Sequence, residues 1–86
     1  MTKQELIKLV EKNKSEISKK LNVIRLEEIR IDDLGDVGAI GIYIDEDDYE
    51  MEVGFAFSIN DDLGEGDDNG EIVIGENIIY YIGYNI

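Results

Sequence analysis

Strict alternation of side-chain types singles out residues 49–59, YEMEVGFAFSI, as the stretch that decides the fold. Every second residue is large and apolar, and the residues between them are acidic or small. The apolar set is Tyr49, Met51, Val53, Phe55, Phe57 and Ile59, and the other set is Glu50, Glu52, Gly54, Ala56 and Ser58. Because successive side chains of a β-strand point to opposite faces of a sheet, the pattern predicts a strand with one apolar face.

Residues 38–45 alternate in the same way, and a run of four acids, Asp45–Asp48, leads from them to this strand. The two segments predict an antiparallel hairpin with an acidic loop. We expect the face that packs against the helix to be lined by Ile40, Ile42, Ile44, Met51, Val53, Phe55 and Phe57. Shorter apolar runs predict further strands at about residues 28–33, 71–75 and 78–84, the last two joined by a tight turn.

The start of the chain has the pattern of an amphipathic helix. Thr2 and Glu5 form a capping-box sequence, and apolar residues from Leu6 to Leu21 recur at helical spacing, which predicts one helix over about residues 3–21. Lysines and glutamates occupy the other side, which we interpret as solvated. Residues 1–86 are therefore predicted to form one α+β domain, with one N-terminal helix packed on a four- to five-stranded antiparallel sheet.

The other face of the predicted sheet is rich in small residues. They are Ala39, Gly41, Gly54, Ala56, Ser58, Gly75 and Gly83, with Tyr43 and Tyr81 among them. Glycine within a strand often marks the close approach of another backbone or a ligand. A partner packed flat on this face and a solvated face with tyrosines over its glycines both fit the pattern, and we favour the solvated face.

Charge is divided unequally along the chain. Residues 31–86 contain sixteen acids and no lysine, arginine or histidine, whereas eight bases and five acids give the first thirty residues +3 within a total of −13. This balance argues against direct binding to DNA, RNA or anionic lipid, because phosphate contacts need many lysines and arginines. Acidity that served only solubility would also cover the helix, so we prefer a functional acidic surface.

The residue types give little support to catalysis. The chain has no cysteine and no histidine, and its few hydroxyl residues have no evident base, so we expect no enzymatic activity and no cofactor. No apolar run approaches the roughly 18 residues of a membrane span, and there is no signal-peptide pattern. A soluble protein of the cytoplasm is therefore expected.

Residues 65–76 can be aligned with the twelve-residue calcium loop of an EF-hand. Asp67, Asn69, Gly70 and Glu76 fall at its positions three, five, six and twelve, but Glu65 replaces the usual aspartate at position one. The flanking segments are predicted strands, whereas an EF-hand has helices there. An acidic loop without a metal is therefore favoured, and a calcium-binding or structural module is the alternative from another class.

Acids gather in the predicted hairpin and in the loop that follows it. Alternate residues of a strand lie about 6.6 Å apart on one face, so Glu50 and Glu52 extend the acids of the hairpin loop as a row. Such a ridge resembles the phosphates of a nucleic-acid strand, for which a groove lined with lysine and arginine is complementary. The candidate contacts for a basic partner are Asp45, Glu46, Asp47, Asp48, Glu50, Glu52, Asp61, Asp62, Glu65, Asp67 and Asp68.

In charge distribution, size and α+β plan, the chain resembles the small acidic nucleic-acid mimics that phages encode against host nucleases, which include anti-CRISPR proteins. The resemblance implies a stoichiometric inhibitor whose acids occupy the nucleic-acid-binding groove of a nuclease, such as a CRISPR effector, in the host cytoplasm. The implied partner is a basic nucleic-acid-binding protein. An immunity protein that neutralises a basic nuclease toxin is the alternative with the same physics.

Overall fold

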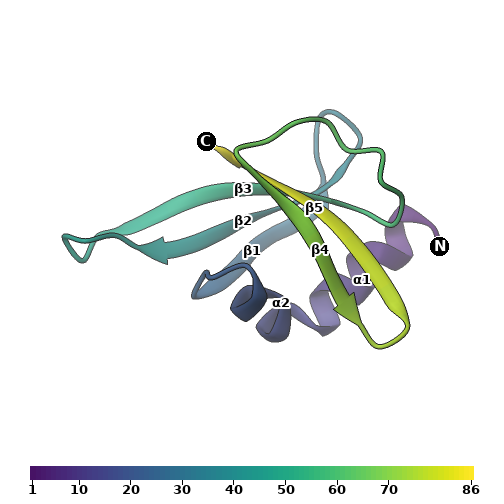
Figure 1. The fold of residues 1–86 in the computed structure, drawn as a ribbon, viewed down its shortest axis with the longest axis horizontal. Coiled ribbons are helices and arrows are strands. Elements are labelled where there is room, and N and C mark those ends of the chain that lie inside the picture. The colour runs from purple at the N-terminus through teal and green to yellow at the C-terminus, as the bar shows by residue number, and fades with distance from the viewer.

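The computed structural model describes all residues, 1–86, and contains two helices and five strands (Figure 1). They are α1 (Lys3–Lys12), α2 (Lys14–Lys20), β1 (Arg25–Ile31), β2 (Val37–Ile44), β3 (Glu50–Ser58), β4 (Asp68–Ile74) and β5 (Asn77–Asn85). The strands form one antiparallel sheet in the order β1-β2-β3-β5-β4, so β3 is the central strand. The predicted α+β class, with the N-terminal helix packed on an antiparallel sheet, is confirmed.

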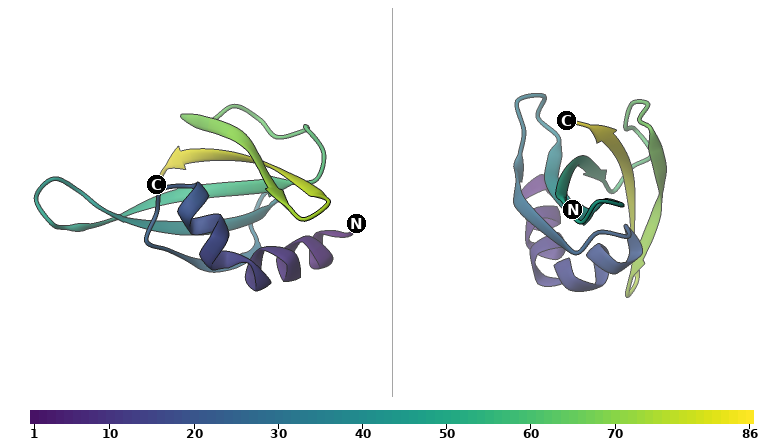
Figure 2. Two further views of the ribbon diagram at one scale, coloured as in Figure 1. Left: turned by 60° about the horizontal axis from the view of Figure 1, so that its bottom comes forward. Right: turned by 90° about the vertical axis from the view of Figure 1, so that its left-hand side faces the viewer.

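The sheet curves around the helical layer. In the view along the long axis, β1 and the β4–β5 pair stand on either side, and the helices fill the concave face between them (Figure 2). The connection from β3 to β4 passes over β5 on the other face, where Gly66 lies against Ile82 and the carbonyl of Gly83. Only the concave face is therefore covered by helices.

The prediction of one continuous helix is wrong, because the helix breaks at Asn13 into α1 and α2. This residue has φ −113° and ψ 21°, and its side-chain amide donates a hydrogen bond of 2.9 Å to the Leu9 carbonyl. Figure 2 shows α2 inclined to α1 beyond this point. The change of direction lets both short helices bury apolar residues in the concave face.

The end of α2 is fixed by a left-handed residue. Asn22 has φ 60°, and its N–H donates to the Lys19 carbonyl while the N–H of Val23 donates to the Ser18 carbonyl. These two bonds form a Schellman motif, for which asparagine is one of the favoured residues. The motif ends the helical layer here and turns the chain into β1.

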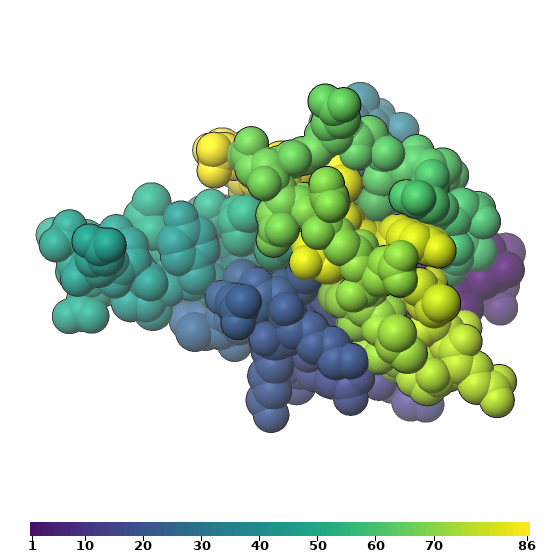
Figure 3. Space-filling model, viewed as in Figure 1, coloured from purple at the N-terminus to yellow at the C-terminus, as the bar shows by residue number.

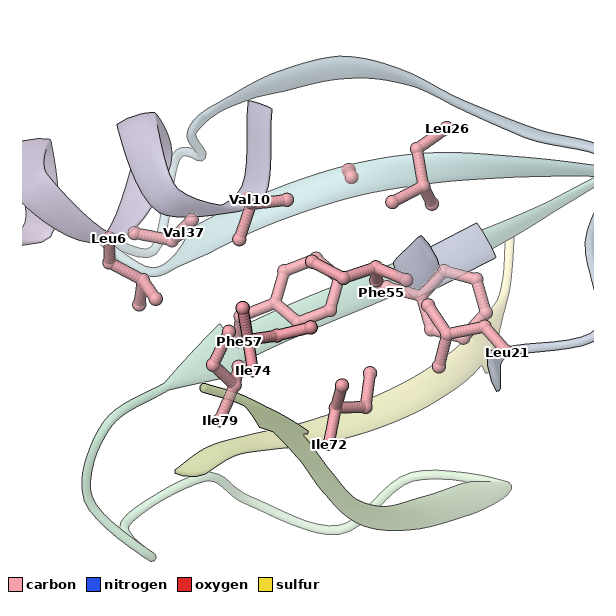
Figure 4. Packing of buried hydrophobic residues seen from close by; sticks show 12 residues of the cluster. Leu6, Val10, Leu21, Leu26, Val37, Phe55, Phe57, Ile72, Ile74 and Ile79 are labelled. Carbon is pink, nitrogen blue, oxygen red and sulfur yellow. The ribbon is translucent and has the colours of Figure 1, made fainter. Parts of the chain in front are cut away.

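The core lies between the helices and the concave face of the sheet (Figure 4). Phe55 and Phe57 of β3 occupy its centre with their ring centroids 6.3 Å apart, and Tyr81 meets Phe55 edge-on at 6.2 Å. The helices and the other strands surround these rings with aliphatic side chains. The buried cluster consists of Leu6, Val10, Ile17, Leu21, Leu26, Val37, Ala39, Phe55, Phe57, Ile72, Ile74 and Ile79.

The predicted inner face of β2 is wrong, although its strand is right. In the observed register Val37 pairs with Phe57 and Ala39 pairs with Phe55, which places the odd residues of β2 against the helices. Ile40, Ile42 and Ile44 therefore lie on the opposite face, in register with Gly54, Glu52 and Glu50. The wide Phe55 ring leaves room only for small β2 side chains beside it, so alanine and glycine stand where isoleucine was expected.

The predicted small-residue face does not exist as one surface, because its members divide between the two faces. Gly41 and Gly83 lie under the Phe55 ring in the core, and a Cβ at Gly41 would come within 2.6 Å of that ring. Gly54 faces the other way, where the ring of Tyr84 covers it and would lie 2.3 Å from a Cβ. A tyrosine thus covers a glycine at Gly54, but it is Tyr84 and not the predicted Tyr43 or Tyr81, which lie on the concave face.

The first and fourth strands begin three residues earlier than predicted, and the turn before the last strand lies one residue before the expected Glu76–Asn77. The first strand begins at Arg25 and contains a bulge between Glu27 and Arg30 where Glu28 adopts φ 51°. The fourth strand begins at Asp68. The tight turn that follows it is formed by Gly75 and Glu76, because Gly75 at φ 60° takes the left-handed position.

Two neighbouring isoleucines of β5 provide a matched test of the core. Ile79 is 0% exposed and Ile78 is 45% exposed. We expect Ile79→Ala to lower the free energy of unfolding by about 2–5 kcal/mol, because it leaves a cavity beside Phe57, and Ile78→Ala to lower it by less than about 1 kcal/mol. Urea denaturation of both variants checks this; equal losses would contradict the assignment of faces in β5.

The N-terminal capping box gives a pH-dependent expectation. Thr2 donates its backbone N–H to the Glu5 carboxylate and accepts the Glu5 N–H at its hydroxyl, and this contact with Thr2 holds the pKa of Glu5 below its ordinary value. A lowered folded-state pKa stabilises the fold above the unfolded pKa, and the contribution is lost as the pH falls through the folded value. Glu5→Gln should therefore melt below the wild type at neutral pH.

That difference in melting temperature should shrink as the pH falls below the ordinary range of a glutamate and vanish in strong acid. Thermal melts of both proteins between neutral pH and about pH 2.5 measure it. A difference that stayed constant over the whole range would contradict a charge-dependent cap.

Candidate protein-interaction surface

The outer part of the β2–β3 hairpin, residues 43–52, extends beyond the helices; we call it the arm. It stands out from the body of the protein in the space-filling view (Figure 3), and the molecule is 40 Å long but only 25 and 20 Å across. Figures 1 and 2 show neither a helix nor another strand beside its outer end. The tip and both faces of the arm are therefore open to another molecule.

Asp45 builds the turn at the tip of the arm. Its Oδ1 accepts hydrogen bonds from the N–H groups of Asp47 at 2.9 Å and Tyr49 at 3.0 Å, and the Asp48 N–H donates to its carbonyl. Asp48 closes the turn with φ 64°, a conformation that aspartate tolerates better than most residues. Asp45, a predicted partner contact, thus uses part of its carboxylate inside the turn.

The remaining acids of the arm are exposed. Glu46, Asp47 and Asp48 surround the tip without an ion pair. Glu50 and Glu52 share the face without helices, as the register with Ile44 and Ile42 requires. This face carries the predicted row of acids, but the negative charge of Glu50 is partly neutralised by an arginine.

Arg25 of β1 neutralises Glu50. Its guanidinium donates to the carboxylates of Glu27 and Glu50, each at 2.7 Å, and these two hydrogen bonds raise the pKa of Arg25. Glu50 is the only acid of residues 31–86 that forms an ion pair. The other fifteen acids of this segment have no cationic partner within the molecule.

The second predicted cluster lies on the connection between β3 and β4. Asp61, Asp62, Glu65, Asp67 and Asp68 are all exposed there. Asp62 accepts a hydrogen bond of 2.6 Å from the Ser58 hydroxyl. Asp61 and Glu65 border an open hollow of about 350 Å³ that Glu71 and Tyr80 also line.

The structure does not bring the two clusters together. The tip of the arm lies at one end of the long axis, and the start of the β3–β4 connection lies towards the other end (Figures 1 and 2). Only Asp67 and Asp68, where the connection returns to the sheet, approach the base of the arm. One partner surface can thus contact the arm together with Asp67 and Asp68. Contact with all eleven predicted residues at once would require a partner that reaches both ends of the molecule.

The EF-hand alignment of residues 65–76 is wrong. Most of these residues form β4, an extended strand paired with β5, whereas a calcium loop must wrap its ligands around one point. No group of three or more aspartates and glutamates anywhere in the protein has a spacing that could hold a metal ion.

The sequence prediction missed the apolar side chains beside the acids. Tyr43, Tyr49 and Met51 on the arm are 36%, 68% and 41% exposed, although the alternation assigns Tyr49 and Met51 to the inner face. Element lengths provide the missing signal. An eleven-residue strand spans about 36 Å, whereas a ten-residue helix spans about 15 Å, so a helix broken at Asn13 cannot cover the whole strand.

No protein-family model, curated protein or solved structure matches this chain. Neither helix is long and apolar enough to cross a membrane.

Two aspartates of the arm allow its turn to be tested without changing the net charge between variants. Asp45→Ala removes the acceptor of two turn N–H groups, whereas Asp47→Ala removes an exposed carboxylate. We expect the Asp45→Ala arm to open more easily by about 1–2 kcal/mol, which speeds exchange of its hydrogen-bonded amides roughly 5- to 30-fold. Amide hydrogen exchange by NMR measures this.

Asp47→Ala should leave the exchange of the arm nearly unchanged, because both variants lose one negative charge but only one loses turn hydrogen bonds. If both variants speeded exchange equally, Asp45 would have no special role in the turn.

Proposed function

We propose that this protein is a stoichiometric inhibitor that binds the basic nucleic-acid-binding surface of a nuclease by presenting carboxylates in place of phosphates. The class of nuclease that we propose is a CRISPR effector, which would make the protein a phage anti-CRISPR. Its contact surface is centred on the β2–β3 arm, with Glu46, Asp47, Asp48 and Glu52 as the principal acids.

One observation carries the proposal: fifteen of the sixteen acids after residue 30 have no cationic partner in the molecule. Like charges held close together repel one another and destabilise the folded state. A cationic partner removes this repulsion on binding, and the lost counterions add to the driving force at low salt.

The shape of the arm supports the same conclusion. A two-stranded β-ribbon is narrow enough to enter a nucleic-acid groove, and a protein cleft that accepts a duplex or a single strand can accept a ribbon of similar width. The tip acids occupy the turn and Glu52 lies on β3 behind them, so carboxylates extend from the tip along the arm as phosphates extend along a nucleic-acid strand. The turn built by Asp45 holds the tip in shape before binding, which lowers the entropy lost in the complex.

The test is a DNA-cleavage assay with guide-loaded CRISPR effectors and a basic nuclease toxin as the panel. We expect cleavage by at least one CRISPR effector to stop at about one equivalent of the protein. Inhibition should weaken steeply as salt is raised, because electrostatic steering is screened. The variant Glu46→Gln/Asp47→Asn/Asp48→Asn should need at least about tenfold more protein for the same inhibition, which corresponds to about 1.4 kcal/mol.

The matched control is Glu11→Gln/Glu28→Gln/Glu76→Gln, which removes the same charge from exposed positions away from the arm. It should inhibit like the wild type. Equal loss in both triple variants would mean that net charge alone matters. Inhibition of the toxin but of no CRISPR effector would favour an immunity protein, and no inhibition of any panel member would refute the proposal.

A further inference from the structure

An apolar strip runs along the inner face of the arm where the helical layer has ended. The strip consists of Tyr43, Tyr49 and Met51. Tyr43 and Met51 are paired across the two strands, and Tyr49 precedes β3 in the same phase as Met51. This strip lies on the opposite face of the arm from Glu50 and Glu52, whose face also carries the exposed Ile44. All the acids of the arm that follow the turn are therefore on the other face from the strip.

The strip continues into a groove at the base of the arm. The groove has a volume of about 250 Å³, and Tyr43 is common to both. Val53 and Phe55 of β3, with Leu21 and Val23 at the end of the helical layer, provide its apolar lining. Large apolar side chains that line an open groove are typical of a binding surface, and tyrosine and methionine are enriched in the centres of protein interfaces.

The charges around this surface decide what can occupy it. Asp67 and Asp68 border the groove, and the acids of the tip surround the far end of the strip. No lysine or arginine lines the groove, and its uncharged polar residues are Asn22, Asn85 and two tyrosines. An occupant that approaches must therefore carry positive charge beside its apolar side chains.

A second copy of this chain does not meet that condition. Two copies would bring together two tips that carry only acids, at a net charge of −13 each. The two free edges of the sheet are also partly blocked, because Lys20 donates to the Val73 carbonyl at 2.9 Å on β4 and a bulge between Glu27 and Arg30 interrupts β1.

We propose that the strip and groove are the anchor site for a segment of the basic partner protein in which an apolar side chain is flanked by lysines or arginines. The apolar side chain enters the groove against Val53 and Phe55, and the flanking cations meet the tip acids on one side and Asp67 and Asp68 on the other. This inference deepens the proposed function and rests on it for the class of partner.

The two faces of the arm then contribute differently. The acids attract the partner and set the association rate, which salt reduces. Tyr43, Tyr49 and Met51 exclude water from the contact and set the dissociation rate, as buried aromatic anchors do in other interfaces. Mimicry of phosphates by charge alone would need no such anchor, so the strip distinguishes this protein from a simple polyanion.

The experiment is an NMR titration of the full-length, ¹⁵N-labelled protein with three synthetic peptides. The first has a central leucine–tryptophan pair flanked by three arginines on each side. The second replaces the central pair by glycine–serine, and the third replaces the arginines by glutamates. We expect the first peptide to shift the amides of Tyr43, Met51, Val53 and Gly83, and to bind at least about tenfold more tightly than either of the others.

The variant Tyr49→Ala/Met51→Ala should weaken binding of the first peptide at least about tenfold without changing its salt dependence. The matched control is Val73→Ala/Ile78→Ala, which truncates two exposed apolar residues at the distant β4–β5 hairpin and should bind normally. If the strip variant does not fold, the comparison of the three peptides on the wild-type protein still tests the anchor site.

Equal binding of the two arginine peptides, with shifts only at the tip, would overturn the anchor site and leave the acidic inhibitor proposal standing. Equal binding of the glutamate peptide would overturn the requirement for a cationic segment. Tight binding of the first peptide in the groove, by a protein that inhibits no nuclease, would support the anchor site and refute the proposed function.

Discussion

The packing of Phe55 and Phe57 against the helices is the interaction on which the rest of the structure depends. These rings sit on the central strand, so their position fixes which residues of β2 and β5 face inward. Ala39, Gly41 and Gly83 beside Phe55 are small because the ring fills the space above them. The isoleucines of β2 consequently lie on the other face. In the outer part of the hairpin, the odd-numbered residues likewise stay on the concave side and the even-numbered residues on the opposite side.

The arm follows from a mismatch between the two layers. The helical layer is short because Asn13 breaks it and Asn22 ends it, whereas β2 and β3 continue beyond it. A strand pair that extends beyond the helices exposes apolar side chains on its inner face, and such exposed apolar side chains often mark an interaction site. Here the patch adjoins carboxylates that have no internal partner. Exposed apolar area and uncompensated charge thus occur together on the one element that stands free of the body.

The acids themselves do not all have one role. Asp45 holds the turn of the arm, Glu50 pairs with Arg25 across the sheet, and Asp62 accepts from Ser58 in the β3–β4 connection. These contacts occupy part of each carboxylate, whereas Glu46–Asp48, Glu52, Asp61, Glu65, Asp67 and Asp68 make no such side-chain contact. A count of acids along the sequence therefore overstates the surface available to a partner, and the hydrogen bonds together with the position of the arm identify the smaller set.

The sequence by itself determined the α+β class, the central hairpin, the capping box and the confinement of acids to residues 31–86, because side-chain period, cap residues and charge are local properties. It also located the acids at the tip, since a loop between two alternating strands must lie at the hairpin end. Only the tertiary structure decided the inward face of β2, because both faces of that strand carry apolar or small residues and Phe55 selects between them. The length of β3 keeps the two acidic clusters apart, because they flank its two ends. Only the tertiary structure uncovered Tyr43 and Met51, because their exposure depends on how far the broken helix reaches along the sheet.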